Sequence, residues 1–284
     1  MINRIIVSSD DSDFLNFWPI VAKAWNKFLP NAKITLAFVT NRDLEDPIFK
    51  KISSFGEVYI FPKDPSIPSA NQAKICRHVL ACFFKNEVSM IEDIDTIPLQ
   101  SDFVTNLSKE YEDGKILFVG NEVYNNTPDE GKIPISNMTG NGIEFSYLFD
   151  PSSSIESFLV GNKFSEDVFI MWKDWKNLNV FDHKESLTNV PDATGLNGFS
   201  DESMIRAIIH KSNAYNRIKK IGRDVDIRDR WIDRSWWGVD GNKLESNYYV
   251  LCNFLRPIKE NYYTCKPVID FIYGYNTSSD LFLL

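Results

Sequence analysis

The fold is decided by the stretch Ser89-Met90-Ile91-Glu92-Asp93-Ile94-Asp95-Thr96-Ile97-Pro98. An apolar strand runs there directly into two carboxylates, Asp93 and Asp95, separated by one residue. Residues i and i+2 of an extended segment point to the same side, so we expect both carboxylates to face one space just past the strand. Mg²⁺ and Mn²⁺ prefer oxygen ligands, and ligands bind at the carboxyl ends of strands in open α/β sheets. The stretch therefore predicts a divalent cation held against a diphosphate.

The same pair also has a plainer interpretation, a loop with two solvated carboxylates, because D-x-D occurs by chance in acidic proteins. Its surroundings favour the metal site. Val88, Met90 and Ile91 predict a buried strand, and Pro98, which has no N–H to give, is expected to end the hydrogen-bonded ladder. The two acids would then lie at an abrupt boundary between core and loop.

Length and charge limit the classes of protein. A chain of 284 residues fits one large α/β domain, or one domain with a small appendage. The hydrophobic content of 43% is enough for a sizeable core. The net charge of −8 argues against a broad basic face for nucleic acid, without excluding nucleic acid as a partner.

The location of the protein is predicted from what the sequence does not contain. No run of 18 apolar residues occurs, so we expect no transmembrane segment. The first residues lack the charged-then-apolar pattern of a signal peptide, so we do not expect them to direct secretion. The four cysteines have no C-x-x-C spacing, which argues against structural zinc and a disulfide framework. We therefore expect thiols in a protein of the reducing cytoplasm.

Strand and helix patterns alternate through the first 120 residues. This alternation predicts an α/β fold with a mainly parallel sheet and right-handed crossovers. Beside the strand before Asp93, we expect strands at 4–7, 34–39, 58–61 and 116–119, and helices at 14–28, 43–53, 73–84 and 102–111.

The second half is less regular. Residues 121–134, 146–157 and 189–198 are expected to be turn-rich, and 166–177 helical. Ser200 is expected to cap a helix through His210, with Asp201 and Glu202 in its first turn. Loops, short strands and an extension that wraps the core are expected after Ile221.

Three features together resemble the nucleotide-sugar-dependent glycosyltransferases of the GT-A fold. They are Ser8-Ser9-Asp10 on the opening strand, the helix with Asn71-Gln72-Ala73-Lys74-Ile75-Cys76-Arg77, and the D-x-D motif Asp93-Ile94-Asp95. The resemblance covers residues 1–120 well, 121–220 loosely and 221–284 not at all. It implies a Rossmann-like catalytic domain over 1–220, with a nucleotide-sugar half (1–120) and an acceptor half (121–220), and a C-terminal extension (221–284) packed on the same domain.

The resemblance also implies roles for individual residues. The bound cation would be Mn²⁺ or Mg²⁺, with Asp95 holding it more directly and Asp93 holding the sugar or ribose side. Ser8, Ser9 and Asp10 would contact the base or ribose, and Lys74 and Arg77 the phosphates or sugar. The alternatives are a polar loop with a helix cap for the first group and a solvated basic face for the second.

Asp201 and Glu202 are the candidate catalytic carboxylates. Inversion needs a base near the acceptor hydroxyl, and retention needs a group that stabilises an oxocarbenium-like centre, so the stereochemistry stays open. Simple helix capping would also explain both acids. Many members of the family add a late histidine to the metal shell; here only Asp233 or Asp240 would be available after Ile221.

The implied function is metal-dependent transfer of a hexosyl or pentosyl group from a UDP- or GDP-sugar to an acceptor glycan or another hydroxyl compound. A sugar-nucleotide nucleotidylyltransferase is less favoured, because residues 8–13 contain no glycine and no basic residue. A phosphotransferase would want Thr where Leu15 stands. A non-catalytic nucleotide- or carbohydrate-binding protein of the same fold remains an alternative.

Overall fold

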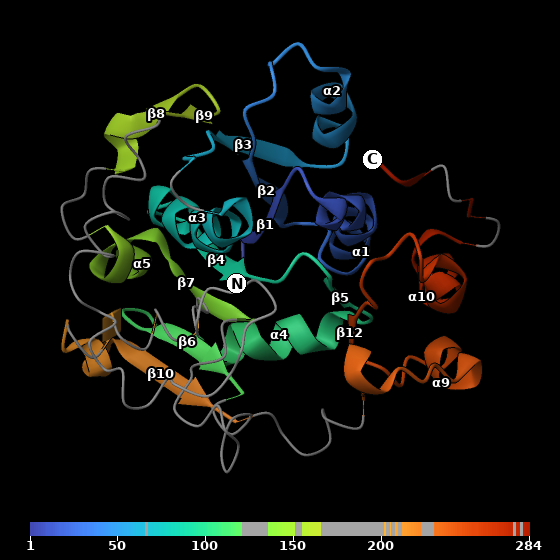
Figure 1. Cartoon of the computed structure of the whole chain (residues 1–284). Coiled ribbons are helices and arrows are strands. Elements are labelled where there is room, and N and C mark those ends of the chain that lie inside the picture. Colours follow the sequence, from blue (N-terminus) through green and yellow to red (C-terminus); the bar gives the residue numbers. More distant parts are fainter. Residues whose placement is uncertain are drawn as a thin grey trace, which may run out of the picture.

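The computed structural model describes residues 1–65, 68–120, 136–150, 155–165, 202, 205, 208–209, 212–222, 230–274, 277–278 and 281–284. These residues form two sheets (Figure 1). The larger sheet has nine strands in the order β10-β6-β7-β4-β1-β2-β3-β9-β8, and the smaller has three in the order β11-β12-β5.

The large sheet is mainly parallel, as the alternation of strands and helices predicts. β1 pairs in parallel with β2 and β4, β2 with β3, β3 with β9, and β6 with β10. Only β7, between β4 and β6, and β8, beside β9, run antiparallel to their neighbours. The strands are β1 (Arg4–Asp10), β2 (Lys33–Val39), β3 (Glu57–Phe61), β4 (Val88–Ile91), β6 (Ile116–Val119), β7 (Met138–Asn141), β8 (Leu159–Val160), β9 (Lys163–Phe164) and β10 (Ile218–Ile221).

Helices cover both faces of this sheet, so its strands are apolar on both sides (Figure 1). Ile5 and Val7 point into one core, and Ile6 between them points into the other. The first core contains residues of α1 (Trp18–Phe28), α2 (Pro47–Ser53), α4 (Ser101–Glu110) and α10 (Tyr262–Tyr273). The second contains residues of α3 (Ser69–Phe83) and α5 (Gly142–Phe149).

The small sheet joins the C-terminal part of the chain to the segment that follows β4. β12 (Leu251–Asn253) pairs antiparallel with β5 (Thr96–Pro98) and parallel with β11 (Trp231–Ile232). The short α9 (Gly241–Glu245) lies between β11 and β12 in the chain. The expected extension that wraps the core is therefore a sheet and the helix α10; the sequence did not predict that helix. Four 3₁₀ turns complete the described elements: η1 (Asp13–Phe17), η2 (Ile155–Phe158), η4 (Ala214–Arg217) and η5 (Arg234–Trp236).

The structure corrects several expected boundaries. The helix expected at 43–53 begins at Pro47, because Asp46 caps it by accepting the amide of Ile48. The expectation of turns at 146–157 is wrong for its first part, which belongs to α5 and follows a capping box of Asn141 and Glu144. Pro98 does not end the strand before Asp93; it is the last residue of β5.

Other expectations lie outside the described residues: the turns at 121–134 and 189–198, the helix at 166–177, and Ser200 and Asp201. The division at 220/221 remains a prediction, and it falls within β10. All four cysteines are buried free thiols. Within the described ranges, no helix combines the length and the apolar character that crossing a membrane requires.

Candidate active site

The order of the strands reverses between β1 and β4. From β1 the chain builds the sheet outward through β2 and β3, and α3 then carries it back to β4 on the other side of β1. Such a switch point, at the carboxyl ends of the strands, is where ligands bind in open α/β sheets. Asp10 ends β1 there, and Glu92 and Asp93 follow β4. The fold thus brings the first and third predicted groups of site residues to one place.

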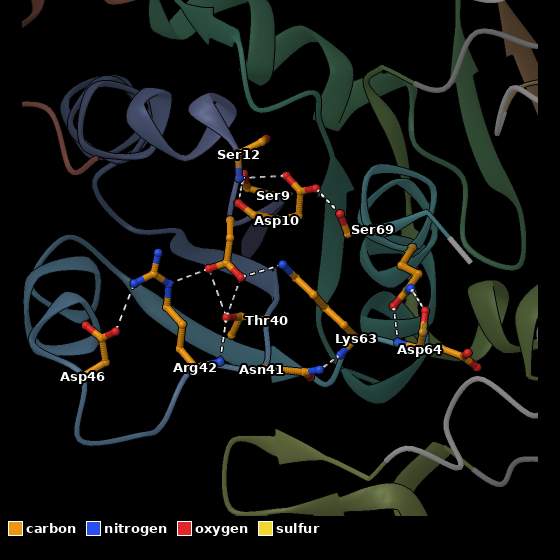
Figure 2. A network of polar contacts seen from close by, with 12 residues as sticks. Ser9, Asp10, Ser12, Thr40, Asn41, Arg42, Asp46, Lys63, Asp64 and Ser69 are labelled. Carbon is orange, nitrogen blue, oxygen red and sulfur yellow. Dashed lines mark hydrogen bonds and ion pairs between the residues drawn. The ribbon is translucent and has the colours of Figure 1, made fainter. Parts of the chain in front are cut away.

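Asp10 connects the end of β1 to the beginning of α3 (Figure 2). Its carboxylate accepts the amide of Ser12 at 3.2 Å and the hydroxyl of Ser69 at 2.6 Å. Ser9 donates its hydroxyl to the carbonyl of Asp10 at 3.0 Å, and Ser8 is buried in the same strand. The predicted contacts of Ser8, Ser9 and Asp10 with a base or ribose remain predictions, and two of the three side chains already bond within the loop.

A second polar network lies beside it, at the carboxyl ends of β1, β2 and β3 (Figure 2). Asp11 accepts the hydroxyl of Thr40 at 2.9 Å and pairs with Arg42 at 2.7 Å and Lys63 at 2.8 Å. Burial alone would raise the pKa of Asp11, but Lys63, Arg42 and Thr40 more than reverse this, and the pKa lies below its usual value. Asp11 is therefore a fixed anion that holds two cationic side chains.

A cavity of about 310 Å³ adjoins this network. Strands in a sheet are spaced by about 4.8 Å, so the ends of β2 and β3 lie roughly 10–14 Å from the end of β4. The volume is at the lower end of the range for small-molecule sites, roughly 300–1,000 Å³. Its lining consists of Thr40, Asn41, Pro62, Lys163, Phe164 and Ser165.

Asp93 is paired with α3. One carboxylate oxygen accepts Nη1 of Arg77 at 2.7 Å, and the other accepts the hydroxyl of Ser136 at 3.0 Å. Arg77 is 3% exposed and also donates to the carbonyl of Glu92. Burial would raise the pKa of Asp93, but Arg77 outweighs it and holds the pKa far below its usual value. Arg77, predicted to contact the sugar donor, is thus also the counter-charge of Asp93.

Asp95 is paired with the C-terminal part of the chain instead. Its side chain is 0% exposed. Arg256 donates two hydrogen bonds to the carboxylate of Asp95, from Nε to Oδ2 at 2.6 Å and from Nη2 to Oδ1 at 2.7 Å. Arg234 adds a bond from Nη1 to Oδ2 at 2.8 Å. Burial would lower the pKa of Arg256, but the bonds with Asp95 raise it above its usual value. The two arginines follow β12 and β11, so the small sheet positions both.

The expectation that Asp93 and Asp95 lie on one side of an extended segment is wrong. A turn separates them, in which the amide of Thr96 donates to the carbonyl of Asp93 at 3.0 Å. The carbonyl of Asp95 then accepts the amide of Phe254 at 2.9 Å, which fixes it to the small sheet. Arg256 is nevertheless close enough to Asp93 for its charge to lower the pKa of that carboxyl.

The side chains, as they lie, do not fit Mn²⁺ or Mg²⁺. No group of three or more His, Cys, Asp or Glu suited to a metal occurs in the described part of the chain. A cation at Asp95 would displace three charge-assisted hydrogen bonds, each contributing about 1.5–3 kcal/mol when shielded from water and less here, because both arginines are partly solvated. Asp233 and Asp240, the late alternatives, each cap a short helix. The cation therefore remains a prediction from the sequence.

Two ionisable residues beside the switch point are buried with few or no hydrogen-bond partners. Both ring nitrogens of His78 are unpaired, and the carboxylate of Glu92 has only weak contacts with the backbone amides of Asp93 and Asn137. Burial raises the pKa of Glu92 well above its usual value and lowers that of His78 well below. Burial thus favours the neutral form of both groups, and the ion pairs at this site are those of the aspartates and arginines.

The remaining predicted residues are only partly placed. Lys74 lies half-buried on α3, about one turn before Arg77. Glu202, Ile205 and Ile209 are each helical, and the two isoleucines are buried in the same core as α3 and α5. Asp201 is outside the described residues, so the catalytic roles of Asp201 and Glu202 remain predictions.

The contacts of Arg234 and Arg256 with Asp95 are the part of the site that sequence reasoning missed. The two arginines stand 139 and 161 positions after Asp95. No spacing or local pattern links either of them to the D-x-D motif. Only the pairing of β12 with β5 brings them together.

Comparison with known proteins gives structural matches alone. No family model matches the sequence, and no curated protein matches it. An active-site mutant of LgtC superposes with a TM-score of 0.53 and 11% identity over 98% of both chains. The galactosyltransferase LgtC with donor and acceptor sugar analogues gives a TM-score of 0.49 and 9% identity, again over 98% of both chains.

The glycosyltransferase GlyE of Streptococcus pneumoniae matches with a TM-score of 0.44 and 10% identity, over 78% of this chain and 45% of GlyE. The chain thus spans about half the length of GlyE. At such low identity, the likeness to the LgtC mutant is evidence of fold. With its mainly parallel nine-stranded sheet covered by helices on both faces, the chain has the Rossmann-like GT-A fold.

Proposed function

We propose that the protein is a glycosyltransferase that moves a hexosyl or pentosyl group from a UDP- or GDP-sugar to the hydroxyl of an acceptor glycan or a related compound. The observation that carries this proposal is the cluster of aspartates and arginines at the switch point of a GT-A fold. LgtC, whose mutant shares the fold, is itself a galactosyltransferase.

The sugar donor would lie across the carboxyl ends of the strands. The cavity at Thr40 and Asn41 would take the base or ribose, and the diphosphate would reach the end of β4, about 10–14 Å away by strand spacing. Lys74 and Arg77 lie on the α3 side of that path. This arrangement gives an anionic ligand cationic partners at its phosphates and a cavity with polar side chains at its base.

The rest of the proposal concerns chemistry and location. Asp201 and Glu202 would act beside the acceptor, as base or as stabiliser of the sugar cation, according to stereochemistry. The predicted Mn²⁺ or Mg²⁺ would require Asp93 and Asp95 to leave their arginines first. We place the reaction in the cytoplasm, since reduced cysteines are typical of that compartment.

The first test is thermal stabilisation by UDP and GDP, each with and without Mn²⁺, followed by release of nucleotide from UDP- and GDP-sugars. A ligand that binds only the folded state adds about 2.7 kcal/mol at a hundred-fold excess over Kd. A shift with one nucleotide identifies the base, and its loss in the Thr40→Val variant would support the cavity. Stabilisation without cleavage of any sugar donor would favour a non-catalytic binding protein. No shift with either nucleotide would refute the proposal.

A further inference from the structure

We propose that Arg256 and Arg234, held in place by Asp95, bind the diphosphate of the sugar donor directly and take the role of the divalent cation. The inference rests on the proposed function and specifies how its site works. Asp95 is then a positioning residue for two arginines, and binding of the sugar donor needs no metal.

The hydrogen bonds of Arg256 leave part of its guanidinium for a ligand. The group carries five N–H donors, and Asp95 takes one from Nε and one from Nη2. Nη1 has no hydrogen bond within the described residues. A guanidinium fixed along one edge can still give its other donors to a phosphate, which is a geometry that arginine favours.

Exposure places the two arginines between the aspartate and the solvent. The side chain of Asp95 is 0% exposed, whereas those of Arg256 and Arg234 are 35% and 39% exposed. An incoming anion therefore meets the guanidinium groups before it meets the carboxylate. A cation that bound the carboxylate of Asp95 would compete with both arginines for its oxygens.

The position of Arg256 matches that of the expected diphosphate. Its guanidinium lies 5.0 Å from the centre of the Phe14 ring, in the turn just after β1, and its charge acts on Asp93 at the end of β4. Arg256 thus lies at the switch point, where strand topology alone places the ligand.

The charge balance also suits an anion. Three arginines, Arg77, Arg234 and Arg256, pair with two carboxylates, Asp93 and Asp95, which leaves one net positive charge. This excess of positive charge within the ion pairs attracts an anionic group such as a diphosphate.

The test measures binding of UDP, GDP and inorganic pyrophosphate by calorimetry, in excess EDTA and in Mn²⁺. We expect Kd for the preferred nucleotide to agree within about twofold between the two buffers, and Arg256→Gln to weaken binding by about tenfold or more in EDTA. Arg234→Gln should weaken binding less, because a single bond to Asp95 positions this arginine less firmly than the two bonds that position Arg256. Circular dichroism and melting of each variant separate lost binding from lost fold.

Arg217→Gln is the matched control. Arg217 is exposed, stacks on Tyr147, and precedes β10, so it lies at the opposite edge of the parallel strands. The Arg217→Gln variant loses the same charge as Arg256→Gln but far from the switch point, so we expect its Kd for the nucleotide to equal that of the wild type.

The outcomes distinguish this inference from the proposed function. Nucleotide binding that requires Mn²⁺ and is abolished by EDTA would overturn the arginine site and leave the glycosyltransferase proposal intact. Binding without metal that Arg256→Gln does not weaken would overturn the assignment of this residue. No binding of any probe in either buffer would refute both proposals.

Discussion

The parallel strands of the large sheet begin at one side, here called the amino edge, and end at the other, the carboxyl edge. Each side holds a cluster of ion pairs built on arginine, and the two clusters differ in which residue is exposed to solvent. At the amino edge, Arg4 is 2% exposed and contacts Glu57, Glu87 and Thr35, with Phe84 stacked 3.6 Å from its guanidinium. At the carboxyl edge, the buried member is the aspartate, and the arginines around it reach solvent. A buried arginine paired with two carboxylates stabilises the fold and is out of reach of solvent, whereas a buried carboxylate that orients partly exposed arginines presents positive charge to a ligand.

The largest effect is expected at the carboxyl edge, from Arg234→Met with Arg256→Met. Methionine keeps much of the apolar cover but leaves Asp95 buried without a counter-charge, which costs about 3–5 kcal/mol. Urea unfolding at pH 7 measures the loss. Adding Asp95→Asn should restore most of it without restoring nucleotide binding. A double variant as stable as the wild type would show that the ion pairs of Asp95 do not stabilise the packing of the small sheet against the segment that follows β4.

Arg4→Met tests the other edge. We expect a loss of roughly 2–3 kcal/mol, less than for a fully buried pair, because Glu57 and Glu87 are partly exposed and can be hydrated. Nucleotide binding should be unchanged, since Arg4 begins β1 and lies at the far end from the switch point. Calorimetry on the folded variant checks this, and weakened binding would break the distinction between the two edges.

The Asp93→Asn variant tests the ion pairs of the carboxyl edge through the pH dependence of the free energy of unfolding. The pKa of Asp93 is lowered in the folded protein, so its pairing stabilises the fold above the unfolded value of about 3.9 and is lost as pH falls toward the folded value. The variant should be less stable by roughly 1–3 kcal/mol at pH 7. Denaturant unfolding from pH 7 to pH 3 should show the two proteins converging below about pH 4. A constant difference across this range would contradict the assignment to Arg77.

Glu92→Gln should have the smallest effect and the opposite sign. The pKa of Glu92 is raised by burial, so its contribution is most favourable below the unfolded value of about 4.3 and is lost as pH rises toward the folded value. The variant should therefore be more stable at pH 7, by about 1 kcal/mol or 2–4 °C in Tm, and equal to the wild type near pH 4. Thermal melting at both pH values tests this, and a destabilised variant at pH 7 would show that Glu92 has an ionised role.

The first 120 residues were predictable because their contacts follow local periodicity. The strands at 34–39, 58–61 and 116–119 and the helix over 102–111 are confirmed within a residue. The fold and the place of Asp93 at the end of a strand followed from the same patterns. α5 was missed although its capping box, Asn141 with Glu144, stands in the sequence, because its residues were interpreted as turns.

Local sequence patterns predicted the alternation of strands and helices and the position of Asp93 at the end of a strand, because helix and strand periods depend on neighbouring residues. The excess of acidic residues follows from composition alone. The order of the strands came from the structure. The partners of Asp93 and Asp95 became apparent only in the folded chain. A turn of a few residues sends one carboxylate to Arg77 and the other to arginines 139 and 161 positions away. The pairing of β5 with β12 makes that contact, and such pairing depends on the folded chain as a whole.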